Sequence, residues 1–167
     1  LYTYQWTYPG KQLLFMGGEF AQPGEWNSGT ALHWERCNEH LPAGVGRLLA
    51  DLNRLQAAHP ALFEWDCDSR GFEWLSGDDR AQSVISFLRR SSHELLAVIL
   101  NFTPVPRENY RIGVPFGGQW EEILNSDATE YGGSGWGNFG GMTAQDVEAH
   151  GRPNSLTLSL PPLGAVF

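Results

Sequence analysis

The chain has 167 residues, an acidic composition and an unusually high content of aromatic side chains. It carries 11 Lys and Arg against 19 Asp and Glu, for a formal net charge of −8, and it contains 7 Trp, 9 Phe and 5 Tyr. Without a Lys/Arg cluster this charge argues against a nucleic-acid partner, and no apolar run reaches the ~18 residues of a membrane span. A neutral or cationic ligand, or none at all, fits the composition.

Two elements are predicted at the start of the chain. Residues 1–8 are expected to be the end of a helix, which the Pro-Gly pair that follows terminates. Residues 13–16, LLFM, form an unbroken apolar run, which is typical of a strand covered on both faces as in a parallel sheet. The sequence therefore predicts a buried strand over residues 11–16, followed by a sharp turn at two glycines.

A long loop, residues 17–42, follows this predicted strand. Side chains just past the C-terminal ends of strands form the active-site rim of a (β/α) barrel, so polar and aromatic groups here are candidates for binding a substrate. Trp26 can stack on a sugar ring and Asn27 can bond hydroxyl groups, while Glu19 can help to shape the site. Each has a structural alternative: Glu19 can hold the loop through backbone N–H or Arg contacts, and a buried Trp26 can anchor it.

A helix is predicted after the loop. Apolar residues at positions 45, 48, 49, 52 and 55 repeat with helical spacing, and charged residues at 47, 51 and 54 lie on other faces. Pro60 marks the end of this pattern. The sequence thus predicts an amphipathic helix over residues 45–58 with one apolar face to bury.

After about residue 70 the pattern changes from helical to extended. Short apolar runs alternate with turns that contain Pro, Gly and polar residues. The predicted strands cover residues 71–75, 83–89, 95–102, 110–114, 120–124 and 156–160. Such a series predicts an antiparallel β-sandwich or a related unit, and hence a mainly β fold class. The single βα unit in front of it looks cut from something larger.

Two tryptophans of this β region are candidates for binding sugar. Trp74 lies on the first predicted strand, where burial of the indole, worth about 4–6 kcal/mol, is the alternative role. Trp136 lies in the glycine-rich stretch 131–141, YGGSGWGNFGG, where exposure is expected. This stretch contains a G-x-G-x-x-G pattern, but no βαβ unit surrounds it and no acidic residue follows about 20 positions later. No dinucleotide or other cofactor is therefore expected.

The two cysteines predict neither a disulfide framework nor a metal site. A chain with its own core is expected to keep Cys37 and Cys67 as free thiols in a reducing, cytoplasmic environment. Cys37 and His40 have the spacing of metal ligands, but no second cluster completes a set of four. No residue is expected to be catalytic, since no histidine has an evident nucleophile partner.

Eight short motifs occur in a specific order along the chain. They are MGGEFAQ (16–22), EWN (25–27), DLNRLQAAHPAL (51–62), GFEWL (71–75), NFTPVPR (101–107), EILNSD (122–127), HGR (150–152) and SLTLSLPPL (155–163). In this order they resemble the C-terminal portion of bacterial glycogen branching enzymes, the 1,4-α-glucan branching enzymes of the α-amylase superfamily. The resemblance runs through almost the whole chain.

The resemblance implies a parent enzyme that transfers α-1,4-glucan segments to 6-hydroxyls and so forms α-1,6 branches in glycogen synthesis. Residues 1–60 would hold the last strand and helix of a truncated (β/α)₈ catalytic barrel, and residues 61–167 the C-terminal β domain. The catalytic carboxylates of the family come from earlier barrel strands, so the chain itself is expected to be inactive. Its partners would be α-glucan and the rest of the catalytic barrel.

Two other interpretations remain open at this point. The chain can be an autonomous carbohydrate-binding module, or a fragment of another α-amylase-superfamily enzyme such as a hydrolase. It begins with Leu1, which favours an excised fragment. The apolar face of the predicted helix would then lack its barrel. We expect this face to pack on the β region, on residues 13–16, or on another copy of the chain by self-association.

Overall fold

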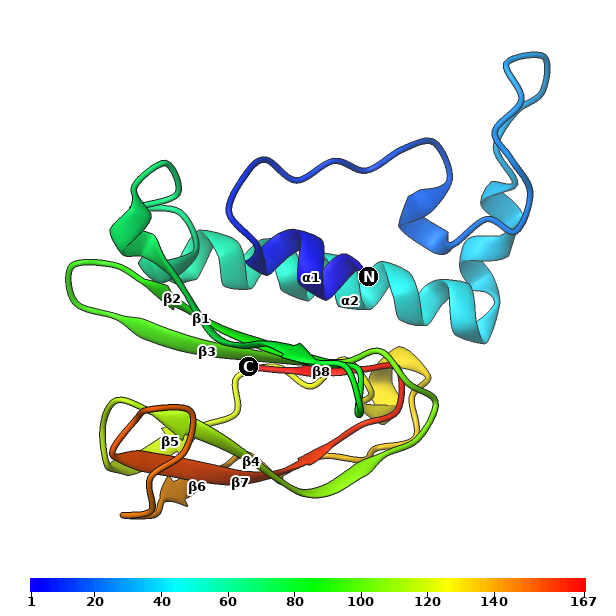
Figure 1. The fold of residues 1–167 in the computed structure, drawn as a ribbon. Coiled ribbons are helices and arrows are strands. Elements are labelled where there is room, and N and C mark those ends of the chain that lie inside the picture. Colours follow the sequence, from blue (N-terminus) through cyan, green and yellow to red (C-terminus); the bar gives the residue numbers. More distant parts are fainter.

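Three layers make up the fold of residues 1–167, all of which the computed structural model describes (Figure 1). The first layer holds two helices, α1 (Tyr2–Thr7) and α2 (His40–Ala58). A four-stranded sheet forms the middle layer, and two pairs of strands form the third. Short 3₁₀ helices lie in the connections: η1 (Gly18–Phe20), η2 (Trp34–Asn38), η3 (Pro60–Leu62), η4 (Ser69–Gly71) and η5 (Thr129–Tyr131).

Every pair of neighbouring strands is antiparallel. The middle sheet has the strand order β1-β2-β3-β8. Its strands are β1 (Phe72–Asp79), β2 (Val84–Arg90), β3 (Leu95–Asn101) and β8 (Ala165–Val166). The third layer pairs β4 (Arg107–Val114) with β7 (Asn154–Leu160), and β5 (Gly118–Glu121) with β6 (Gly141–Ala144). The predicted mainly β, antiparallel fold class is confirmed.

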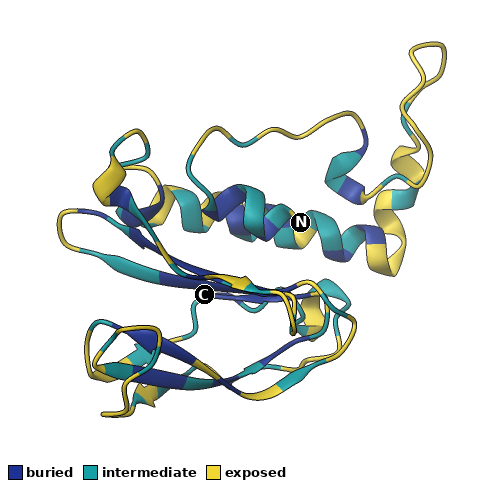
Figure 2. Cartoon of the chain, viewed as in Figure 1, coloured by how far each residue is buried: buried dark blue, intermediate teal, exposed yellow.

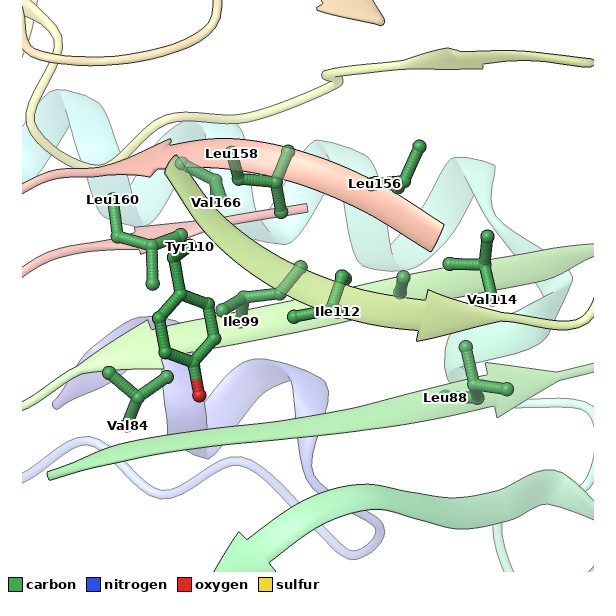
Figure 3. Close-up of a cluster of buried hydrophobic side chains, with 11 residues drawn as sticks. Val84, Leu88, Ile99, Tyr110, Ile112, Val114, Leu156, Leu158, Leu160 and Val166 are labelled. Carbon is green, nitrogen blue, oxygen red and sulfur yellow. The ribbon is translucent and has the colours of Figure 1, made fainter. Parts of the chain in front are cut away.

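The middle sheet is buried on both faces, because β2 and β3 are apolar at successive positions. In β3, Ala97 and Ile99 belong to the cluster between the two β layers, whereas Val98 and Leu100 belong to the cluster under the helices. Figure 3 shows the first cluster, whose side chains come from β2, β3, β4, β7 and β8. The dark blue of the central strands in Figure 2 marks the same burial. One sheet thus connects two hydrophobic cores.

The apolar face of α2 packs on this sheet. Leu49 and Leu52 are buried in a cluster with Phe87 of β2 and Val98 of β3. The expectation that this helix face packs on the β region is therefore confirmed. The helix begins at residue 40 instead of the predicted 45, since Pro42 occupies its first turn, where a missing N–H costs no hydrogen bond.

The strand predicted over residues 11–16 does not form, and that prediction is wrong. The segment is an irregular connection that crosses above α2, and Leu13 and Phe15 are 72% and 61% exposed (Figures 1 and 2). A strand needs a neighbouring strand to pair its backbone N–H and C=O groups, and no strand of this chain runs beside the segment. The two-sided burial inferred for LLFM occurs in β2 and β3 instead.

Two observed strands, β6 and β8, were not predicted from the sequence. β6 starts at Gly141, inside a composition that favours a loop, and it extends only because it pairs with β5. β8 has two residues, which pair with Ile99 and Leu100 of β3. Segments this short contain too few residues for a period of two to be recognised. Their structure depends on the strand beside them.

Arg89 of β2 is a fully buried charged residue on the face that the helices cover. Its guanidinium donates hydrogen bonds to the carbonyl oxygens of Thr7 (2.6 Å), Leu62 (3.1 Å) and Gly71 (3.2 Å). It also pairs with the Asp66 carboxylate at 2.9 Å. Burial lowers the pKa of Arg89, and the hydrogen bond and charge of Asp66 oppose that shift. One side chain therefore joins α1, η3 and η4 to the middle sheet.

The substitution Arg89→Met is expected to lower the free energy of unfolding by about 3–5 kcal/mol, because it leaves the Asp66 charge and three carbonyl groups without their donor. Guanidinium denaturation followed by circular dichroism measures this change. Arg70→Met is the matched control, since Arg70 pairs with Asp68 on the surface and should leave the stability near its starting value. Equal stability of the two variants would contradict the anchoring role of Arg89.

Leu52→Ala is expected to cost about 2–5 kcal/mol in unfolding free energy through the cavity it opens beneath α2. Leu52 is 1% exposed, whereas Leu41 on the same helix is 61% exposed. Leu41→Ala should therefore unfold near the midpoint of the unmodified chain. Urea titrations of both variants test whether α2 belongs to the same cooperative unit as the sheet; a Leu52→Ala midpoint equal to that of Leu41→Ala would show that it does not.

Candidate functional site

The loop between α1 and α2 carries three of the five predicted site residues: Glu19, Trp26 and Asn27. It passes over α2, and its tip projects away from the rest of the chain (Figure 1). η1 holds the base of the loop, because Phe20 is buried and the Tyr2 hydroxyl donates to the carbonyl of Gly18 at 2.7 Å. The predicted turn is present, with Gly17 in the left-handed region at φ 86°.

Glu19 lies on η1, which contacts α2, and its side chain is half-buried. Burial, and after it the charge of Glu19, raises the pKa of Tyr2, so the two side chains are neighbours. The carboxylate of Glu19 takes part in no ion pair. The alternative role as an anchor through arginine is therefore not observed.

Trp26 and Asn27 line two adjacent hollows of the loop. The Trp26 indole is 42% exposed and meets Phe15 edge-on, with ring centroids 5.5 Å apart, and both rings line the first hollow. The residues shared by the two hollows are Gln22, Gly24 and Glu25. An exposed aromatic ring beside amide and carboxylate groups can stack on a pyranose and bond its hydroxyls. Glu19 lines neither hollow.

Asn27 also has a structural role in this loop. Its side-chain oxygen accepts a hydrogen bond from the backbone N–H of Gly29 at 2.8 Å, which closes a tight turn. The side-chain NH₂ group remains at the exposed surface. Asn27 is therefore held in one orientation and still presents a donor to the hollow that it lines.

Trp74 lies on β1, the edge strand of the middle sheet, and combines the two roles that the sequence left open. Its ring centroid lies 5.0 Å from that of Phe72, 5.8 Å from Phe87 and 6.2 Å from Tyr8. The remainder of the indole is exposed. Trp74 thus extends an aromatic cluster to the surface, away from the α1–α2 loop tip.

Trp136 lies in the glycine-rich loop, whose base is bound to α2. The Tyr131 hydroxyl donates to the Asp51 carboxylate at 2.8 Å, and burial together with this bond raises the pKa of Tyr131. The backbone N–H of Trp136 donates to Asp127 at 3.2 Å, and its carbonyl accepts from the Asn125 amide at 2.8 Å. These bonds fix the backbone of Trp136 while its side chain stays exposed.

Two half-buried carboxylates of the β region, Glu73 and Glu94, are engaged by basic side chains. Glu73 pairs with both Arg90 and Arg152, and Glu94 pairs with His59 at 2.6 Å. Retaining glycoside chemistry requires two carboxyl groups about 5–5.5 Å apart on either side of the scissile bond. Their contacts with basic side chains give Glu73 and Glu94 a structural role.

The structure also bears on the cysteines, on metal binding and on membrane-spanning helices. Cys37 and Cys67 are both unpaired and exposed, as expected for free thiols. No group of three or more His, Cys, Asp or Glu residues is arranged to hold a metal ion. None of the helices combines the length and the hydropathy needed to cross a membrane.

Sequence reasoning missed one further hollow, which lies between the start of β3 and β5. Its lining includes Phe116, Trp120 and the His59–Glu94 pair. The only local signal is Phe116 in a Pro-Phe-Gly-Gly turn, where an apolar side chain has little chance of burial. The other residues that line the hollow are distant from Phe116 in the sequence and come together only in the folded chain.

The β layers place the chain in a known class of domain. Residues 74–167, more than half of the chain, match the family described as "Alpha amylase, C-terminal all-beta domain". The chain belongs to this family. The matched residues include most of β1 and all of the later strands, so the family definition coincides with the two β layers.

The relatives extend the match to the helical layer. The "1,4-alpha-glucan branching enzyme GlgB" of Cereibacter sphaeroides is 53% identical over 167 residues, covering 99% of this chain and 23% of that protein. The enzyme of the same name from Pseudomonas putida is 54% identical over 166 residues, again 99% of this chain and 23% of the relative. The resemblance to the C-terminal portion of bacterial branching enzymes is confirmed.

The chain is also similar to a solved structure. Isomaltulose synthase (PalI) from Klebsiella sp. LX3 aligns with a TM-score of 0.44 and 20% sequence identity. The alignment covers 73% of this chain and 17% of that chain.

Proposed function

We propose that this chain is the C-terminal portion of a cytoplasmic 1,4-α-glucan branching enzyme, which transfers α-1,4-glucan segments to 6-hydroxyls in glycogen synthesis. The observation that carries the proposal is an identity of 53–54% along 99% of the chain with branching enzymes of two bacteria. The chain spans only 23% of the length of these relatives. Catalysis therefore resides in the remainder of such an enzyme, and the chain contributes structure and glucan binding without a cofactor.

Residues 1–60 belong to the catalytic barrel of this enzyme, and residues 61–167 form its C-terminal β domain. The support comes from large apolar side chains in this part of the chain that are exposed. These are Leu13, Phe15, Met16, Trp34 and Leu41. Exposed apolar surface of this kind marks an interaction site, and the rest of the barrel is its natural partner. In isolation the same surface would promote self-association.

The glucan is bound first of all by the α1–α2 loop. Trp26 offers an open indole and Asn27 an oriented amide at the hollows of this loop. Glu19, with an unpaired carboxylate, lies at the base of the loop, outside both hollows. Trp74 and Trp136 are peripheral contacts for longer chains, since each is partly exposed on a separate element.

Two alternatives have specific support. The exposed tryptophans also suit an autonomous carbohydrate-binding module, which would bind glucan without any barrel. The family match by itself also suits a hydrolase of the α-amylase group. Product analysis separates the enzymes, because a hydrolase releases reducing ends whereas a branching enzyme creates α-1,6 linkages.

A chimera tests the proposed function. The matched region of the Cereibacter sphaeroides enzyme is replaced by this chain, and amylose is supplied as substrate. The chimera should form α-1,6 linkages at a rate within about tenfold of the parent, measured by the anomeric proton signals. This chain alone should form none, because it lacks the catalytic pair. Branching by the chain alone, or a folded chimera that only releases reducing ends, would contradict the proposal.

Trp26→Ala tests the loop as a glucan-binding surface. The variant should bind maltoheptaose about fivefold more weakly or worse, since an aromatic stacking partner typically contributes about 1 kcal/mol or more. Isothermal titration measures the affinity. Trp34→Ala is the matched control: Trp34 is 54% exposed in the same loop but lines neither hollow. Equal affinities of both variants would remove Trp26 from the binding surface.

A further inference from the structure

The hollow between the start of β3 and β5 has the form of a small-ligand site. It measures about 400 Å³, which falls in the range of small-molecule pockets. Its lining comes from the start of β3 and from β5. Both segments lie at the same end of the β layers (Figure 1). The lining groups that carry the argument are Phe116, Trp120, His59, Glu94, Gln119 and Glu121.

Two aromatic residues, Phe116 and Trp120, line this hollow. Phe116 is 59% exposed, although a large apolar side chain gains most from burial. The indole N–H of Trp120 donates to the carbonyl of Phe116 at 3.3 Å, which closes the turn between them. Gly118 adopts φ 95° within that turn, a conformation that side chains rarely tolerate. The exposed ring is therefore presented from a closed, well-defined turn.

A histidine–carboxylate pair also lines the hollow. The Nδ1 atom of His59 lies 2.6 Å from one oxygen of Glu94, and the other oxygen accepts the backbone N–H of Ala61 at 2.9 Å. With the carboxylate as acceptor, Nδ1 carries the proton of this bond. The second ring nitrogen, Nε2, makes no hydrogen bond within the chain, and the His59 side chain is 22% exposed.

The polar groups that line the hollow indicate which ligand charge it favours. The lining contains two carboxylates, Glu94 and Glu121, and no Lys or Arg. An anionic ligand would meet like charge without a compensating cation, so phosphate-bearing molecules are disfavoured. The Gln119 amide is engaged within β5 and β6, since its oxygen accepts from the Thr143 hydroxyl at 2.7 Å and its nitrogen donates to the Trp120 carbonyl at 3.5 Å. An open aromatic face with neutral and acceptor groups around it matches a polyhydroxylated, uncharged ring.

We infer that this hollow is a separate α-glucan-binding site on the β domain, distinct from the α1–α2 loop. One glucose residue stacks on the Phe116 ring, and one of its hydroxyls bonds to Nε2 of His59. The inference rests on the proposed function for the identity of the glucan. Phe116 and Trp120 lie outside all eight motifs, whereas His59 lies within the motif of residues 51–62.

Titration of the ¹⁵N-labelled chain with maltoheptaose tests the site. Amide shifts should concentrate on residues 116–121, with a second group in the α1–α2 loop that reports Trp26 independently. Phe116→Ala should weaken the affinity obtained from the residue 117–121 amides by about fivefold or more. Phe102→Ala is the matched control, because Phe102 is 48% exposed but lies outside this hollow.

A second variant tests the contribution of His59. His59→Gln retains a donor toward Glu94 and removes the free ring nitrogen, so it should also weaken this affinity while the circular dichroism spectrum stays unchanged. Absence of shifts at residues 116–121, or unchanged affinity in Phe116→Ala, would overturn the inference. The branching proposal would survive that result, since the chimera tests it through α-1,6 linkages alone.

Discussion

The arrangement of the helical layer depends on the buried guanidinium of Arg89. Removing a cation from water costs several kcal/mol, and only a full set of acceptors in good geometry offsets that cost. Here the acceptors come from the end of α1, from η3, from the segment before β1 and from Asp66. These segments satisfy the charge only when they converge over the same face of β2. The guanidinium therefore specifies one position of the helices on the sheet, whereas apolar contacts alone would tolerate several.

The position of the helices on the sheet determines where the loops with the proposed binding residues lie. Because α1 and α2 are held on the sheet, the loop between them is carried at a fixed place with Trp26 and Asn27 at its exposed side. Tyr131 and Arg47 bind the glycine-rich loop to α2, through the Asp51 carboxylate and the Glu130 carbonyl. The proposed binding surfaces thus belong to connected parts of one fold, although they come from separate parts of the sequence.

A polymeric ligand makes this arrangement useful. A glucan chain bound weakly at one surface stays near the other surfaces of the same body, so the second contact is intramolecular and has a high effective concentration. Individual affinities in the millimolar range, about −4 kcal/mol, then suffice to retain the polymer. The β domain of a branching enzyme would in this way keep its substrate close to a barrel that performs the chemistry.

Local pattern alone established the mainly β class, the apolar face of α2 and most of the strands, because period and turn residues report the conformation of nearby residues. The ordered motifs additionally identified the family. The tertiary structure decided each feature that depends on a neighbouring segment. Residues 11–16 stay irregular because no strand lies beside them, whereas β6 and β8 are extended because each pairs with a neighbouring strand. Trp74 packs in an aromatic cluster with part of its indole and exposes the remainder. The tertiary structure also brought His59, Glu94, Phe116 and Trp120 to one hollow. Strand pairing and the packing of the layers bring such distant residues into contact, and the spacing of residues along the chain does not predict these contacts.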